Sequence, residues 1–140
     1  MTENLDKILV EKYPKIFANR YKDMKETAMC WGFECHDGWY WLIDQLCSSL
    51  QNYIDWNGKE QVVATQVKEK FGTLRFYVTG GDELTSGMIW LAEAMSRNVC
   101  ELCGSTTDIG QTSGWIMTSC KSCADSHNFQ HWKPHNKIIS

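Results

Sequence analysis

The chain has 140 residues, of which 43% are hydrophobic and 22% are charged, and its formal net charge is −3. This composition excludes a disordered or collagen-like chain, and the length suits one compact domain or a small body with a metal-held appendage. The net charge argues against a protein whose whole surface binds nucleic acid. No export leader or membrane-spanning apolar stretch is visible, so we expect a cytoplasmic protein without a membrane partner.

Helices are predicted over most of the first 56 residues. Apolar residues recur at helical spacing over residues 4–12, 15–28 and 37–56, and the last stretch is the main packing helix. Asp37 is its candidate N-cap, and Gly58 ends it. The apolar positions used are Leu5, Ile8, Leu9, Ile16, Phe17, Tyr21, Met24, Trp39, Leu42, Ile43, Leu46, Leu50, Tyr53 and Ile54.

The hydrophobic period then becomes two, which predicts a β-hairpin over residues 62–79 with its turn at Phe71 and Gly72. A helix over 84–98, started by Asp82 or Thr85, follows it. Alternation along the hairpin predicts two different faces. The core-facing residues are Val67, Leu74, Phe76 and Val78, and the opposite, cationic face carries Gln66, Lys68, Lys70, Arg75 and Tyr77.

Four cysteines form two Cys-x-x-Cys pairs, Cys100 with Cys103 and Cys120 with Cys123, separated by 16 residues. This spacing predicts one structural Zn²⁺, because a two-residue spacer lets one turn present two thiolates to the same ion. Four ligands leave no open coordination position, so the ion is not expected to take part in a reaction.

The predicted zinc module spans residues 99–140 and packs on a body of residues 1–98. A strand over 114–118 and a helix over 123–127 favour a treble clef, with a zinc ribbon as the alternative. The expected fold class is therefore α+β: N-terminal helices, a β-hairpin or small antiparallel sheet, and this module. Three further cysteines and a histidine leave open a second metal site, with buried free thiols as the alternative. They are Cys30, Cys35, His36 and Cys47.

Known catalytic patterns are not matched. A nuclease built on a treble clef needs a histidine on the hairpin, and none lies between Cys103 and Cys120. A zinc deaminase needs His-x-Glu and an open zinc position, but the sequence reads His36-Asp37-Gly38. An enzyme is therefore uncertain and less expected than a binding protein.

Aromatic residues exceed what one core needs, since the chain has seven tryptophans. Aromatic rings left on a surface are typical of interfaces. Trp39, Tyr40 and Trp115 are therefore candidate binding residues, together with Lys68, Lys70, Arg75 and Tyr77 on the cationic face. A solvated strand face and tryptophans that wedge the module against the body are the alternatives.

Five stretches together resemble a family of small, uncharacterised bacteriophage and prophage proteins with a C-terminal four-cysteine zinc module. The resemblance implies a viral accessory protein in a bacterial cytoplasm, and it implies no activity. The stretches are DGWYWLIDQLC (37–47), QVKEKFGTLRFYVTGGD (66–82), GMIWLAEAMS (87–96), CELCG (100–104) and GWIMTSCKSC (114–123).

These observations lead to three functional hypotheses. The first is a non-enzymatic accessory protein that binds a host protein, either to blunt a defence or to redirect a host machine. The second is nucleic-acid binding by the basic hairpin face and the zinc module. The third is binding or cleavage of a nucleotide signal. The sequence does not predict an oligomeric state.

Overall fold

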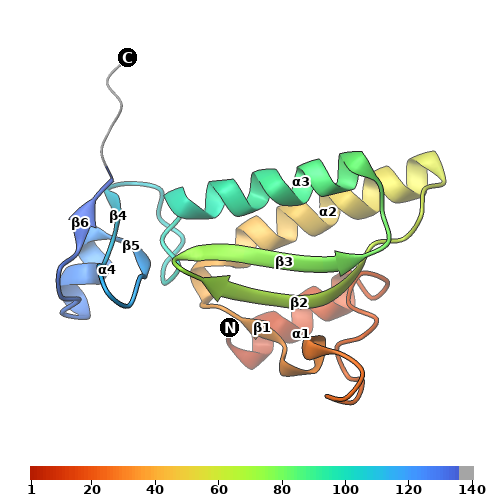
Figure 1. Cartoon of the computed structure of the whole chain (residues 1–140), viewed down its shortest axis with the longest axis horizontal. Helices are drawn as coiled ribbons and strands as arrows, with labels where there is room; N and C mark the ends of the chain where they lie inside the picture. Colours follow the sequence, from red (N-terminus) through yellow and green to blue (C-terminus); the bar gives the residue numbers. More distant parts are fainter. Residues whose placement is uncertain (136–140) are drawn as a thin grey trace.

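The structure of residues 1–135, a computed structural model, is an α+β fold in which helices pack behind a small sheet (Figure 1). Helices α2 and α3 lie side by side, α1 lies near β1, and a second small sheet forms at the C-terminal end. The predicted fold class is confirmed. The elements are α1 (Glu3–Lys12), β1 (Phe33–Glu34), α2 (Tyr40–Asn57), β2 (Val63–Lys70), β3 (Thr73–Thr79), α3 (Glu83–Met95), β4 (Ile109–Gln111), β5 (Thr118–Cys120), α4 (Lys121–Ser126) and β6 (Lys133–Pro134), with 3₁₀ turns at Ala28–Trp31, Asp37–Trp39 and Ser96–Asn98.

The first sheet has the strand order β1-β2-β3. Strands β2 and β3 form the predicted antiparallel hairpin, in which Lys68 lies opposite Arg75 and Val67 lies opposite Phe76. Strand β1 pairs with β2 in parallel, so the sheet is mixed rather than wholly antiparallel. Two residues are too few to show a periodic pattern, which is why the sequence did not predict β1.

Helix α2 supplies the centre of the hydrophobic core, as its apolar pattern predicts. Gly58 ends it in the left-handed conformation, with φ of 58°. The α-helix begins at Tyr40 rather than at Asp37, because residues 37–39 form a 3₁₀ turn that leads into it. The Asp37 carboxylate accepts the Thr2 N–H (2.7 Å) and is not the N-cap of α2. No helix in the described part of the chain, α2 included, is long and apolar enough to cross a bilayer. The buried residues of α2 are Leu42, Ile43, Leu46, Cys47, Leu50 and Ile54.

The helix predicted over residues 15–28 does not form, and turns occupy most of this segment. Ile16 and Phe17 are buried as expected, but the Ile16 carbonyl accepts the N–H of Ala64 in β2 (2.8 Å). Because that carbonyl is committed to a distant strand, it cannot accept a hydrogen bond within a helix. Tyr21 and Met24, which the prediction placed on the same apolar stripe, are exposed.

Helix α3 covers the outer edge of β3. Asp82 and Thr85 form a reciprocal capping box at its start, as predicted, and it ends at Met95, before the predicted residue 98. The Glu93 carboxylate accepts the Phe76 N–H (2.8 Å), and the Ser96 hydroxyl accepts the Leu74 N–H (2.9 Å). Both N–H groups belong to the unpaired edge of the sheet, so these side chains satisfy donors that would otherwise be open.

The turn between β2 and β3 places a bulky residue in an unfavourable conformation. Phe71 and Gly72 both have positive φ, of 52° and 77°, which is the type I′ geometry of two-residue hairpins. Glycine and asparagine are the usual residues there, because a Cβ crowds the carbonyl in the left-handed region. The Phe71 ring is exposed, and the Lys70 ammonium lies 5.7 Å from its centre.

Phe71→Asn should therefore stabilise the fold. We expect the free energy of unfolding to rise by about 1 kcal/mol, because asparagine tolerates positive φ. Chemical denaturation measures this value. Phe71→Leu serves as the control, since it removes the ring and its contact with Lys70 but keeps the strain. If the Phe71→Asn variant has no higher free energy of unfolding than the Phe71→Leu variant, the strain interpretation is wrong.

Candidate metal centre

The structure brings the four predicted cysteine ligands together. Cys100 and Cys103 lie in the tight turn after α3, Cys120 ends β5 and is the N-cap of α4, and Cys123 lies in the first turn of α4. All four sulfur atoms lie within 4.8 Å of one another. Residues far apart in the sequence therefore converge on one point.

The sulfur positions suit a metal ion. The Cys103 and Cys120 sulfurs are 3.7 Å apart, whereas a disulfide requires about 2.05 Å. A tetrahedral ion with metal–sulfur bonds of about 2.3 Å would separate its sulfurs by about 3.8 Å. The Cys123 N–H also points at the Cys120 sulfur (3.4 Å), as in knuckle turns that support thiolates. The four thiols can hold one metal ion.

The surroundings of the cluster shift the pKa values of three of the four thiols. Burial raises the pKa of Cys100, but the N–H groups of Cys103, Cys120 and Leu102 outweigh it, so this pKa is lowered. Burial, together with neighbouring thiols, raises the pKa of Cys103 and of Cys123. A divalent ion favours the thiolate at every ligand, so metal binding would release protons here.

The surrounding elements form a treble clef. Strands β4 and β5 pair antiparallel after the first cysteine turn, and α4 follows and carries the last ligand. The helix after the hairpin distinguishes this arrangement from a zinc ribbon. The strand predicted over 114–118 lies instead at β5, because residues 113–117 form a loop in which Thr112 bonds to Trp115 and Met117. Strand β6 pairs with β4 and was not predicted, and residues 136–140 of the predicted module lie outside the described residues.

The first cysteine turn is fixed to the body by close backbone contact. The Gly38 N–H donates to the Glu101 carbonyl (2.7 Å), and a Cβ on Gly38 would lie 2.2 Å from the Cys100 carbonyl oxygen. Glu101 lies between two cysteine ligands and is almost fully buried, and one of its oxygens accepts from the backbone and the ring of His36. The buried Trp39 indole donates to the Val99 carbonyl (3.0 Å). Sequence reasoning missed Gly38 and Glu101, since neither has a ligand-like spacing.

The candidate second metal site is not assembled. Among residues 1–135, the four zinc-type cysteines are the only group of three or more potential ligands that converge. Cys35 and Cys47 lie in the hydrophobic core, where burial raises the pKa of Cys35 to about 12 and that of Cys47 well above its usual range. Both are therefore inert buried thiols.

The candidate binding residues fall into three environments. Trp39 is fully buried and is a core residue in this structure, and Tyr40 is half-buried against the core. Trp115 is 86% exposed on the treble clef. The remaining four share the outer face of the hairpin, as alternation predicts, and are Lys68, Lys70, Arg75 and Tyr77.

Metal analysis tests the centre directly. The purified chain should contain one metal ion, and Cys103→Ser should lose it together with the fold of residues 99–135, because the ligation free energy is folding free energy. Elemental analysis and circular dichroism before and after chelation measure both effects. Cys30→Ser is the matched control and should keep one ion. Two ions per chain, or a metal-free chain with an unchanged unfolding curve, would contradict this assignment.

Gly38→Ala tests the contact between the body and the treble clef. The added methyl group would overlap backbone atoms of Cys100 and Glu101, so we expect a loss of about 2 kcal/mol or more in the free energy of unfolding. Gly87→Ala in α3 is the control, because nothing lies within 4 Å of its Cβ, and it should be neutral or stabilising. If Gly38→Ala and Gly87→Ala change the free energy of unfolding equally, the Gly38 contact is dispensable.

Comparison with protein-family models, with curated proteins and with solved structures found no match to this chain. Its function must therefore be inferred from its own residues.

Proposed function

We propose that this chain is a non-enzymatic binding protein whose treble clef is held by one structural zinc ion. Four soft thiolates in a tetrahedron suit zinc, and they leave no position for substrate or water. Hydrogen bonds of Gly38, Trp39 and Glu101 link the cysteine cluster to the body, so a metal ion that fixes the cluster would also fix the start of α2. The ion therefore supports the fold, and binding is assigned to surfaces of the body.

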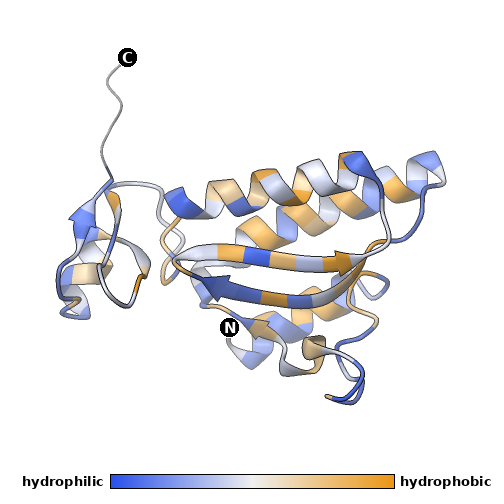
Figure 2. Ribbon diagram, viewed as in Figure 1, coloured by the Kyte–Doolittle hydropathy of each residue, from blue (hydrophilic) through white to orange (hydrophobic). Residues whose placement is uncertain are grey.

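The observation that carries this proposal is an apolar groove between α2 and α3. Trp41 is 62% exposed, Leu91 is 55% exposed and Met95 is 41% exposed, although all three are hydrophobic. They border a cavity of about 210 Å³. Figure 2 shows hydrophobic residues along both helices. The groove is lined by Trp41, Leu42, Gln45, Leu46, Ser49, Met88, Leu91, Ala92 and Met95.

The lining of the groove indicates the kind of partner. None of its nine residues is charged, and Gln45 and Ser49 are its polar members. A groove between two helices with an aromatic anchor suits the apolar face of an amphipathic helix from another protein. Gathered apolar side chains of this kind mark protein interfaces, whereas scattered ones do not.

We place this partner in the host of a bacteriophage. The support is the resemblance of residues 37–47, 66–82, 87–96, 100–104 and 114–123 to small phage and prophage proteins. On this proposal the chain acts in the bacterial cytoplasm and binds a host protein, either to counter a defence or to redirect a host machine. Since Trp39 is buried, the proposed contacts with the partner are instead Trp41, Leu91 and Met95.

Nucleic-acid binding by the hairpin is the second candidate. Lys68, Lys70 and Arg75 share one face of the sheet, and none forms an ion pair within the described residues. Exposed Tyr77 lies on the same face. Free cations beside an aromatic ring are typical of surfaces that bind single-stranded nucleic acid.

Affinity capture with paired tryptophan variants tests the first candidate. The tagged chain should recover one dominant protein from a bacterial lysate, and Trp41→Ala should reduce that recovery by about tenfold or more, because buried tryptophans dominate interface energies. Quantitative mass spectrometry measures the recovery. Leu91→Ser, on the opposite wall, should have the same effect.

Trp56→Ala is the matched control. Trp56 is also on α2 and is 87% exposed, but it does not line the groove. Its removal should leave the recovery unchanged. A recovery that Trp41→Ala leaves unchanged, or that falls equally with Trp56→Ala, would overturn the proposed interface.

A further inference from the structure

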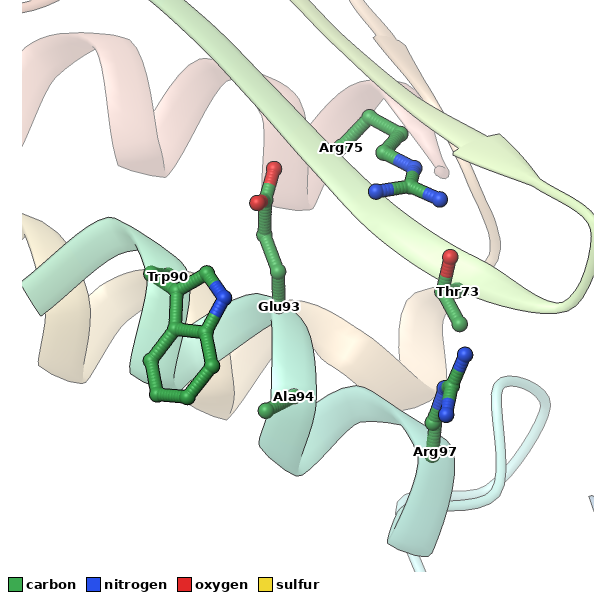
Figure 3. Close-up of a pocket in the computed structure, with 6 residues that line it drawn as sticks. All are labelled: Thr73, Arg75, Trp90, Glu93, Ala94 and Arg97. Atoms are coloured by element: carbon green, nitrogen blue, oxygen red, sulfur yellow. The ribbon is translucent and has the colours of Figure 1, made fainter. Parts of the chain in front are cut away.

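A second cavity lies on the other flank of α3, where this helix meets β3 (Figure 3). Its volume is about 230 Å³, and six residues line it. Helical spacing gives α3 two different flanks, because residues 90, 93 and 94 face this cavity while 88, 91, 92 and 95 face the apolar groove. Arg97, in the 3₁₀ turn that follows α3, also lines the cavity. We call this cavity the arginine notch; its lining residues are Thr73, Arg75, Trp90, Glu93, Ala94 and Arg97.

The Arg75 side chain lacks a hydrogen-bond acceptor within the described residues. Its Nε is fully buried and has no hydrogen-bond partner among the described residues, and its guanidinium forms no ion pair there. A guanidinium is always charged and presents five donors in a planar fork. Because Nε itself is buried, an oxyanion would contact the two terminal nitrogens, and a guanidinium without an anionic partner favours such a contact.

Further cations surround Arg75. Figure 3 shows the guanidinium groups of Arg75 and Arg97 on opposite sides of Thr73. On the neighbouring strand, Lys68 lies opposite Arg75 and Lys70 lies opposite Thr73. None of these four cations has a salt-bridge partner within residues 1–135.

Two carboxylates lie close to these cations. Glu93 lines the notch, but its Oε2 accepts the Phe76 N–H. Glu34 in β1 is next to Lys68 in register and accepts a hydrogen bond from Gln66. Four cations against two anions leave this face positive, although the chain as a whole is negative.

We propose that the arginine notch binds the phosphate of a nucleotide, with Arg75 and Arg97 as its ligands. The planar fork of arginine matches phosphate oxygens, and Lys68 and Lys70 add charge from the adjacent strand. This site is independent of the apolar groove. It rests on and deepens the second candidate function if the nucleotide is part of a single strand, and it stands apart from that function if the nucleotide is free.

The size of the notch indicates that only the phosphate enters it, and the residue at its rim indicates where a base would lie. Pockets that enclose drug-sized ligands measure about 300–1,000 Å³, so a cavity of about 230 Å³ holds a phosphate but not a whole nucleotide. Trp90 lies at the notch and is 70% exposed. Its open ring can stack on a base that stays outside the cavity.

Calorimetric titration of the full, metal-loaded chain at low salt tests this site with three probes: inorganic phosphate, thymidine monophosphate and a short oligothymidylate. Both nucleotide probes should bind, and their binding should weaken as salt increases. Arg75→Gln and Arg97→Gln should each lower the affinity by about tenfold or more, since each removes charged hydrogen bonds to phosphate. Trp90→Ala should weaken both nucleotide probes and leave binding of inorganic phosphate unchanged.

Lys22→Gln is the matched control. It removes the same charge from an exposed residue in the segment before β1, and it should change the affinity by less than about twofold. Thermal melting of each variant verifies its fold. Arg97 is exposed, so its variant keeps the test valid if Arg75→Gln does not fold.

The remaining outcomes separate the two nucleotide sources and the ways in which the proposal fails. Affinity that is higher for the oligothymidylate than for thymidine monophosphate supports a strand as the ligand, whereas equal or higher affinity for the mononucleotide supports a free nucleotide and removes the second candidate function. The proposal is overturned if none of the probes binds, or if Arg75→Gln and Arg97→Gln have no more effect than Lys22→Gln. It is also overturned if a polyglutamate peptide binds more tightly than the nucleotides.

Discussion

The contact between Gly38 and the first cysteine turn is the constraint on which the rest of the structure depends. The N–H of Gly38 reaches the Glu101 carbonyl only because no side chain separates the two backbones. Glu101 follows Cys100, so the geometry of the four-cysteine cluster determines where its buried carboxylate meets His36. The same junction places Trp39 in the core at the start of α2. A metal ion held by the four cysteines would therefore be coupled to the packing of the main helix.

Helix α3 presents different chemistry on its two flanks. One flank, with Leu91 and Met95, opens onto α2 and is apolar. The other, with Trp90 and Glu93, opens onto β3 and borders the notch that Arg75 and Arg97 line. A partner in the groove and an anion in the notch would thus contact the same helix without competing for the same side chains. Glu93 has two roles: it lines the notch, and its carboxylate accepts the Phe76 N–H of β3.

Local patterns predicted much of this fold. The two Cys-x-x-Cys pairs, the hairpin over 62–79 and the helix stop at Gly58 depend on residues near one another in sequence, and all three are present. The helix over 15–28 failed because a distant contact, from Ala64 to the Ile16 carbonyl, decides that segment. Hydropathy could not tell buried Trp39 from exposed Trp41, since both lie within one broad apolar stretch and packing against Val99 distinguishes them.

The same limit applies to the candidate sites. Spacing identified the four cysteines that converge, because a knuckle turn places its two sulfurs within four residues. The arginine notch joins Arg75 to Arg97, and the groove joins Trp41 to Leu91, across separations that no local motif spans. Alternation did place Lys68, Arg75 and Tyr77 on one face, and the structure shows that the predicted helix α3 packs where it completes the cavity.

The side chains of Glu93 and Ser96 have a consequence for how other molecules can attach. These two side chains accept the outward N–H groups of Leu74 and Phe76, so a strand from another molecule cannot pair with this edge of the sheet. Recognition by β-augmentation, in which a peptide extends a sheet through its main chain, is therefore closed along this side of β3. A ligand must be recognised here through side-chain chemistry, which can discriminate among partners in a way that generic main-chain pairing does not.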